Sequence, residues 1–293
     1  APLIPLNDFF FNLEKANYQI SPDGTYYAYM SPWEDRMNIF VQKIGEDDSL
    51  QLTKEKDRDI DGYFWASNER LLYLQDTGGD ENFKLYGVNV DGSNFVALTD
   101  FDGVRTTIID QLREVPDEVI VGLNKRNPQV FDPYRLNINS GELTMLAENP
   151  GNIMGWLTDH EGKLRVAMAI TGGVNQTLLY RDNEDEEFRE VITTSFKENL
   201  SPQFFTFDNQ DVYAVSNLGR DKAAAVVFDL HEGKETEVLY ENPDYDVSRI
   251  GYSRKDMELT AAYFTSWKME RHFFSEDFRE LIQNLDANLG ADQ

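Results

Sequence analysis

The sequence predicts an all-β fold, a β-propeller followed by a C-terminal amphipathic helix. Hairpin-like segments recur along the chain, a second pair of short strand signals precedes each of them, and helical periodicity is absent until Ser275. Each hairpin alternates apolar and polar residues about a turn, and successive turns lie roughly 45 to 49 residues apart, within the range of propeller blades. The five hairpins occupy residues 38–53, 84–99, 134–148, 177–193 and 225–241.

The strand pair before each hairpin completes a four-stranded repeat. In the first repeat the strand signals are 18–20 and 26–30, and in the second they are 62–65 and 70–74. Four short strands per repeat are the signature of a propeller blade. The later repeats show the same arrangement, with strand signals at 106–110 and 118–124, at 152–157 and 164–170, and at 203–207 and 211–216.

The last repeat has three strand signals, at 247–252, 258–264 and 269–273, and then a helix. Ser275 is a suitable N-cap, and acidic residues follow it in the first turn. We therefore predict five full blades and a partial sixth. The predicted bounds are 1–17 for an N-terminal segment, 18–57, 58–103, 104–149, 150–198, 199–243 and 244–274 for the blades, and 275–293 for the helix and tail.

Composition limits the classes of partner. The chain has 293 residues, of which 41% are hydrophobic and 13% aromatic, enough for a large core. Its net charge of −26 argues against a nucleic-acid partner, because phosphate recognition needs clustered Lys and Arg. The absence of cysteine excludes disulfides and thiolate chemistry. No stretch approaches the roughly 20 apolar residues of a membrane span, so we expect no membrane insertion, and the compartment stays open between cytoplasm and periplasm.

Four short motifs resemble those of a known family. Ser21–Gly24 is a Ser-Pro-Asp-Gly turn before an aromatic strand, an element of TolB-like and prolyl-oligopeptidase propellers. From about Pro2 to Gly290 the sequence resembles the prolyl oligopeptidase family of serine peptidases, and in particular its bacterial acylaminoacyl-peptidase-like members. Three longer stretches narrow the resemblance to these members: Pro32–Glu34 before Asn38, Asp76–Asn82 before Leu85, and Asn124–Pro128 before Asp132–Arg135.

The resemblance implies a seven-bladed propeller followed by an α/β-hydrolase domain that carries a Ser-Asp-His triad. This sequence contains no Gly-x-Ser-x-Gly elbow, the turn that exposes the nucleophile in such domains. Its three histidines, His160, His231 and His272, lie in or beside turn and strand signals. We therefore expect a non-catalytic propeller domain that gates and positions peptide substrates for a downstream α/β-hydrolase domain of the parent chain, absent from this sequence.

Two other functions stay open at this point. A free-standing TolB-like propeller would act as a protein-binding module and would close its ring within the chain, and the helix that starts at Ser275 argues against that arrangement. A propeller that binds or cleaves glycans would need a carboxylate pair at a suitable separation. With 53 acidic residues in the chain, the sequence does not single out such a pair.

Candidate binding residues lie in the loops between the second and third strands of the blades. In blade two this loop carries Asp80, Glu81 and Asn82. In the resembled family the corresponding face meets the hydrolase domain and helps to frame the N-terminal side of the substrate, so these residues are candidates for substrate or domain-interface contacts. Asx residues also satisfy backbone groups within turns, and Arg126 also suits a local ion pair, so both interpretations stay open. The same face would carry Arg36, Arg126, Asn175, Arg220 and Lys268.

One pattern resembles a metal loop. Asp57, Asp59 and Asp61 alternate and Gly62 follows, which matches the opening of a calcium loop. The twelfth position is Asn68 where such a loop needs a bidentate Glu, and no helix pattern flanks it. The preferred interpretation is an acidic connection between the first and second blades. The three aspartates stay a weak candidate for a cation site. No cofactor is expected.

Overall fold

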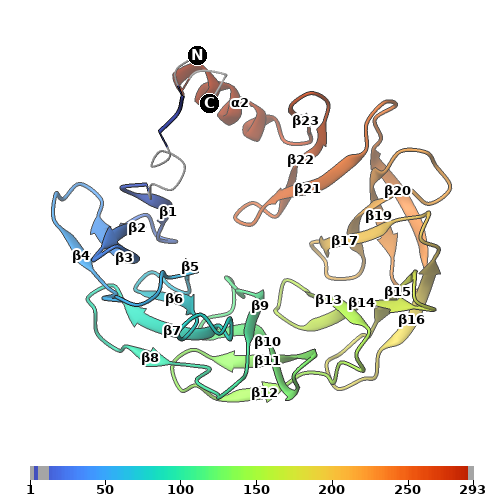
Figure 1. The fold of residues 1–293 in the computed structure, drawn as a ribbon. Helices are drawn as coiled ribbons and strands as arrows, with labels where there is room; N and C mark the ends of the chain where they lie inside the picture. The colour runs from blue at the N-terminus through green and yellow to red at the C-terminus, as the bar shows by residue number, and fades with distance from the viewer. Residues whose placement is uncertain (1–2, 6–12, 290–293) are drawn as a thin grey trace. The chain divides into compact units, whose positions relative to one another are not determined.

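The computed structural model describes residues 3–5 and 13–289, which form strands β1 to β23 and helix α2 (Figure 1). Most of the predicted N-terminal segment 1–17 lies outside the described residues. The chain divides into two compact units, residues 1–151 and residues 152–293. None of the helical segments in the described residues combines the length and the apolar character that crossing a bilayer requires.

The first unit contains three four-stranded antiparallel sheets, and in each of them the strands lie side by side in chain order. The first sheet is β1 (Ala16–Ile20), β2 (Tyr26–Trp33), β3 (Arg36–Lys43) and β4 (Ser49–Gln51); the second is β5 (Gly62–Trp65), β6 (Arg70–Gln75), β7 (Lys84–Asn89) and β8 (Val96–Ala97); the third is β9 (Thr106–Asp110), β10 (Glu118–Asn127), β11 (Val130–Asn137) and β12 (Leu143–Met145).

The second unit repeats this arrangement twice and then departs from it. Its third sheet has three strands, after which the chain turns into helix α2 (Glu276–Leu289). The sheets are β13 (Ile153–Thr158), β14 (Leu164–Thr171), β15 (Asn175–Tyr180) and β16 (Arg189–Thr194); β17 (Leu200–Phe205), β18 (Val212–Ser216), β19 (Ala224–Asp229) and β20 (Lys234–Tyr240); and β21 (Val247–Ser253), β22 (Glu258–Thr265) and β23 (Met269–Phe273).

Ser275 begins the helix as predicted. Its hydroxyl accepts a hydrogen bond from the backbone N–H of Phe278 at 3.3 Å, which satisfies one of the free donors of the first turn. The same hydroxyl donates to Glu258 on β22 at 2.7 Å, so the cap also ties the helix to the sheet before it. The predicted all-β architecture with a C-terminal helix is confirmed.

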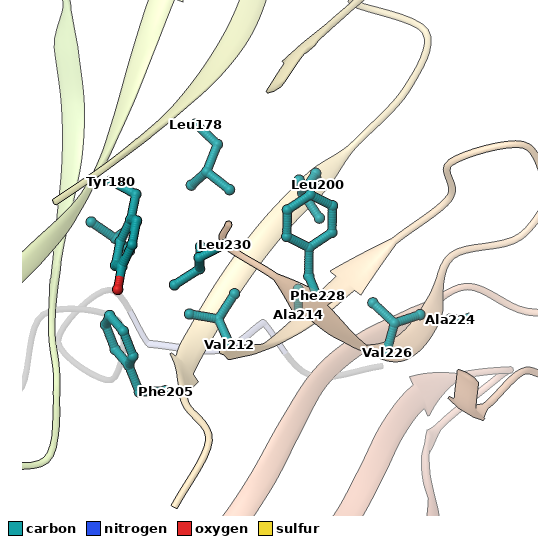
Figure 2. Close-up of a cluster of buried hydrophobic side chains, with 11 residues drawn as sticks. Leu178, Tyr180, Leu200, Phe205, Val212, Ala214, Ala224, Val226, Phe228 and Leu230 are labelled. Carbon is teal, nitrogen blue, oxygen red and sulfur yellow. The ribbon is translucent and has the colours of Figure 1, made fainter. Parts of the chain in front are cut away.

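Side chains of the middle strands hold neighbouring sheets together. Successive residues of a strand point to opposite faces, so a strand between two sheets buries both of its faces. In β6, Leu71 and Tyr73 pack toward the β1–β4 sheet, whereas Leu72 packs toward the β9–β12 sheet. In the second unit, Tyr180, Phe205 and other buried residues fill the space between the β13–β16 and β17–β20 sheets (Figure 2).

The β17–β20 and β21–β23 sheets also meet through an aromatic contact. The imidazole of His272 on β23 lies flat against the ring of Tyr240 on β20, with ring centroids 4.0 Å apart. Partial desolvation and, secondarily, the positive charge of Arg279 lower the pKa of His272 from its ordinary value of 6.5, although the residue remains exposed on β23. The folded state therefore favours the neutral imidazole.

This contact predicts a loss of stability on mild acidification. Because the pKa of His272 is lower in the folded state than in the unfolded state, its protonation favours unfolding as the pH falls below about 6.5 and has no effect well above it. We expect His272→Phe, which keeps the ring contact, to flatten the decline of the unfolding midpoint between about pH 7 and pH 5.5. Arg279→Ala should flatten it partly. An unchanged decline in both variants would contradict this assignment.

Candidate functional site

Two kinds of segment meet at one end of the sheets. Because neighbouring strands are antiparallel, the loop from the second to the third strand of a sheet lies at the same end as the connection that leaves its fourth strand. In the first unit, ion pairs lie at this end: Lys56 in a connection contacts Glu34 in a loop at 3.0 Å, and Lys84 at the start of β7 contacts Asp100 in the next connection. We call this end of each unit its loop end.

The longest of these loops in the first unit, residues 76–83 between β6 and β7, is the acidic loop. Gly78 and Gly79 take φ values of 64° and 85°, which glycine adopts without steric cost. The carboxylate of Asp80 accepts hydrogen bonds from the backbone N–H groups of Thr77 and Asn82 and from the Asn82 side chain. The bonds from Asn82 lower the pKa of Asp80. Asp80 and Asn82 therefore stabilise the turn itself.

Glu81 differs from its two neighbours. Its φ of 57° lies in the left-handed region, which is uncommon for a residue with a side chain. Its backbone N–H donates to Asp76 Oδ2 at 3.2 Å. The Glu81 side chain is exposed, and among the described residues no hydrogen bond or ion pair reaches its carboxylate. The acidic loop therefore presents one free carboxylate to solvent.

An ion pair between a half-exposed arginine and a buried carboxylate lies against the acidic loop. Asp76, whose side chain is 2% exposed, accepts hydrogen bonds from Arg58 Nε at 3.0 Å and from Arg58 Nη2 at 3.3 Å. The hydrogen bond with Asp76 raises the pKa of Arg58. Gly79 lies against the same guanidinium, since a Cβ built on it would be 3.5 Å from Arg58 Nη1. Sequence reasoning missed Arg58, because it lies within the stretch that resembles a metal loop.

The three candidate arginines all form hydrogen bonds or ion pairs with nearby groups of their own unit. Arg126 forms a two-pronged contact with buried Asp132, with both N–O distances 3.0 Å, and it also donates to the Asn149 carbonyl at 2.7 Å. Arg220 forms a two-pronged contact with Glu235 on β20. Arg36 donates to the backbone carbonyl of Asp57 at 3.0 Å. Through these contacts all three arginines brace loops and connections, and their contact with substrate or a partner domain stays a prediction.

The aspartates of the metal-like pattern lie in the connection from β4 to β5. Asp59 Oδ1 accepts a hydrogen bond from the backbone N–H of Met37 at 2.7 Å, and Asp57 contributes its backbone carbonyl to Arg36. The backbone N–H of Asp61 donates to Leu74. Within residues 3–5 and 13–289, no three carboxylate or imidazole side chains converge to hold a metal ion. The acidic-connection interpretation accounts for these contacts.

The loop end of the second unit is less charged and more apolar. Trp267, between β22 and β23, is 86% exposed, and Lys268 lies over its ring. Asn175 begins β15 at the same end. The exposed apolar side chains of these loops and connections are Val174, Phe196, Tyr245 and Trp267.

The opposite end of the second unit holds a polar depression of about 510 Å³. Several of its acidic side chains are engaged in the fold: Asp159 pairs with Arg165 at 3.2 Å, and Glu184 accepts from the backbone N–H of Leu164. Asp182 accepts from the Tyr180 hydroxyl at 2.9 Å. These three carboxylates hold turns together.

The chain is similar in sequence to two curated peptidases. No protein-family model matches the sequence. The chain is 31% identical over 246 residues to dipeptidyl aminopeptidase BIII of Pseudoxanthomonas mexicana, a match that covers 81% of this chain and 35% of that protein. It is 25% identical over 302 residues to dipeptidyl peptidase family member 6 of Caenorhabditis elegans, a match that covers 97% of this chain and 40% of that protein. The chain thus spans less than half the length of these curated relatives.

A solved structure supports the fold. The structure of a prolyl endopeptidase superposes with a TM-score of 0.61 at 9% identity, covering 86% of this chain and 39% of that one. At this identity the likeness shows the fold alone, and it confirms the predicted propeller. The TolB-like binding module is less supported, because the curated relatives are peptidases.

Proposed function

We propose that the chain is the β-propeller domain of a serine peptidase of the prolyl oligopeptidase family, and that it gates and positions peptides by their N-terminus for an α/β-hydrolase domain of the same protein. The proposal depends on one observation above the others, the unpaired and exposed carboxylate of Glu81 on a braced loop. One curated relative is named a dipeptidyl aminopeptidase and the other a dipeptidyl peptidase family member, which agrees with recognition of a free N-terminus.

The chemistry of a peptide N-terminus suits this carboxylate. The α-amino group has a pKa of about 7.7 to 8.0, so it is mostly a cation at neutral pH. A carboxylate that forms no other ion pair accepts the ammonium hydrogens without first giving up a partner. The net charge of −26 also favours the approach of a cationic peptide end. Fixing that end sets which peptide bond reaches the nucleophile, a gain in rate through orientation.

The reacting groups would come from the partner domain. A serine peptidase needs a nucleophile, a general base and an oxyanion hole, and we assign none of these to the propeller. The exposed Trp267 and Phe196 at the loop end of the second unit support this pairing, because large apolar side chains at that exposure suit burial against another domain. The bracing of loops by Arg126 and Arg220 supports a stiff rim that admits short peptides.

Glu81→Gln tests the proposal in the protein that carries both domains. The substitution keeps the shape of the side chain and removes its charge. We expect kcat/KM for a dipeptide p-nitroanilide with a free α-amine to fall about 10- to 100-fold, since a hydrogen bond to a charged group contributes about 1.5 to 3 kcal/mol. The same substrate with an acetylated amine should react equally with both proteins.

The matched control is Glu237→Gln, which removes an exposed carboxylate from β20. It should leave both substrates unaffected. Equal losses on the free and the acetylated substrate would show that Glu81 supports the fold or the domain pairing, and would refute recognition of the amine.

A further inference from the structure

The Glu81 carboxylate forms no ion pair, although the guanidinium of Arg58 lies nearby, because Arg58 is paired with Asp76. The guanidinium of Arg58 lies against the acidic loop, and its Nε and Nη2 are bonded to the Asp76 carboxylate. An unpaired Arg58 would lie within the field of Glu81 and would compete with any ammonium for it. Asp76 removes that competition.

Asp76 also fixes the backbone of Glu81. Its Oδ2 accepts from Arg58 Nη2 and from the Glu81 backbone N–H, so one carboxylate joins the cation below the loop to the residue at its tip. That N–H bond holds a residue whose φ of 57° is unfavourable for a side-chain-bearing residue. The Asp76 carboxylate is buried, which strengthens its bond to the Glu81 N–H, whereas the Arg58 side chain is 47% exposed.

Arg58 in turn is anchored outside the sheet that carries the loop. It lies in the connection from β4 to β5, which Arg36 fastens through the Asp57 carbonyl and which Asp59 fastens through the Met37 backbone. Gly79, whose φ of 85° favours glycine, lies in van der Waals range of the guanidinium. The acidic loop is thereby connected, through Arg58, to the β1–β4 sheet.

We infer that Arg58 and Asp76 form a positioning pair, which orients Glu81 and keeps its carboxylate available to the ammonium of a peptide. This inference rests on the proposed function of Glu81 and adds the residues through which Glu81 acts. Arg58 and Asp76 do not touch the substrate. A purely structural pair would support the domain without any preference for substrates that carry a free amine.

A double-mutant cycle separates these cases. Asp76→Asn leaves Arg58 without its anionic partner, so Arg58 can turn to Glu81, and we expect KM for the free-amine dipeptide p-nitroanilide to rise about 10-fold with little change in kcat. Arg58→Gln loosens the loop without adding a competitor, and we expect a rise of about 3-fold. The double variant should resemble Arg58→Gln, because the competing cation is gone.

Three controls complete the test. Each variant is assayed on the acetylated substrate, its unfolding midpoint is measured, and Glu46→Gln in the exposed Lys43–Glu46 pair is the matched control variant. The inference requires effects confined to the free-amine substrate and a double variant better than Asp76→Asn. It is overturned if the double variant is as impaired as Asp76→Asn, or if both substrates lose activity in parallel with the midpoint. If Glu81→Gln discriminates between the substrates and the pair does not, the inference fails while the proposed function stands. If Glu81→Gln does not discriminate, the proposed function itself fails.

Discussion

Phe228→Ala is expected to destabilise the second unit by about 3 to 5 kcal/mol, the usual cost of removing a large aromatic ring from a close-packed core. Phe228 on β19 is fully buried and belongs to the cluster of Tyr180, Phe205 and Val212 (Figure 2). The residues around it come from two sheets that are each pinned by backbone hydrogen bonds, so they cannot collapse fully into the vacated space. The loss therefore includes a cavity in addition to the lost burial.

Urea unfolding followed by circular dichroism measures this effect. The matched control is Phe196→Ala, which removes the same ring from a site that is 70% exposed and should change stability by less than about 1 kcal/mol. Equal, small effects of the two substitutions would mean that this cluster does not hold the two sheets together.

The sheets were predictable because their signals are local. Alternating hydrophobicity and turn residues lie within a few positions of each other, so each four-stranded repeat and the cap at Ser275 can be read from the sequence. The first strand of the fifth repeat was predicted about three residues late, at 203–207, whereas β17 spans Leu200–Phe205. Thr206 already belongs to the next turn, where its hydroxyl donates to Asp208 at 2.6 Å.

The candidate site was less predictable, because its key contacts join residues from different repeats. Glycines and acidic residues mark the acidic loop, and the sequence thus identified Glu81 as a candidate. The bond from Arg58 to Asp76 spans 18 positions, and its two ends lie in a connection and in a loop with no shared periodicity. The three alternating aspartates predicted oxygen ligands, whereas the side chain of that stretch that bonds to the acidic loop is Arg58, which lies between them.

Asp132→Ala is expected to destabilise the first unit by about 2 to 3 kcal/mol. Asp132 begins the buried part of β11 with no exposed surface, and its carboxylate accepts from the Asn149 backbone N–H at 2.8 Å and from two nitrogens of Arg126. Removal leaves a buried N–H without its acceptor, which costs about 1 to 3 kcal/mol. The loss of the ion pair adds less than for a fully buried pair, because Arg126 is 37% exposed and water can solvate it.

The position of Asp132 shows why the loss should extend beyond a single contact. In the β1–β4 sheet, Asn38 occupies the corresponding place on β3 and accepts from the backbone N–H of Glu55 in the next connection at 2.7 Å. A buried polar residue early in the third strand thus fixes the chain that leaves the sheet in both cases. Asp132→Asn keeps an acceptor for Asn149 and should lose about half as much stability. Equal losses for Asp132→Asn and Asp132→Ala would attribute the effect to the charge pair with Arg126 and not to the tie that holds the connection.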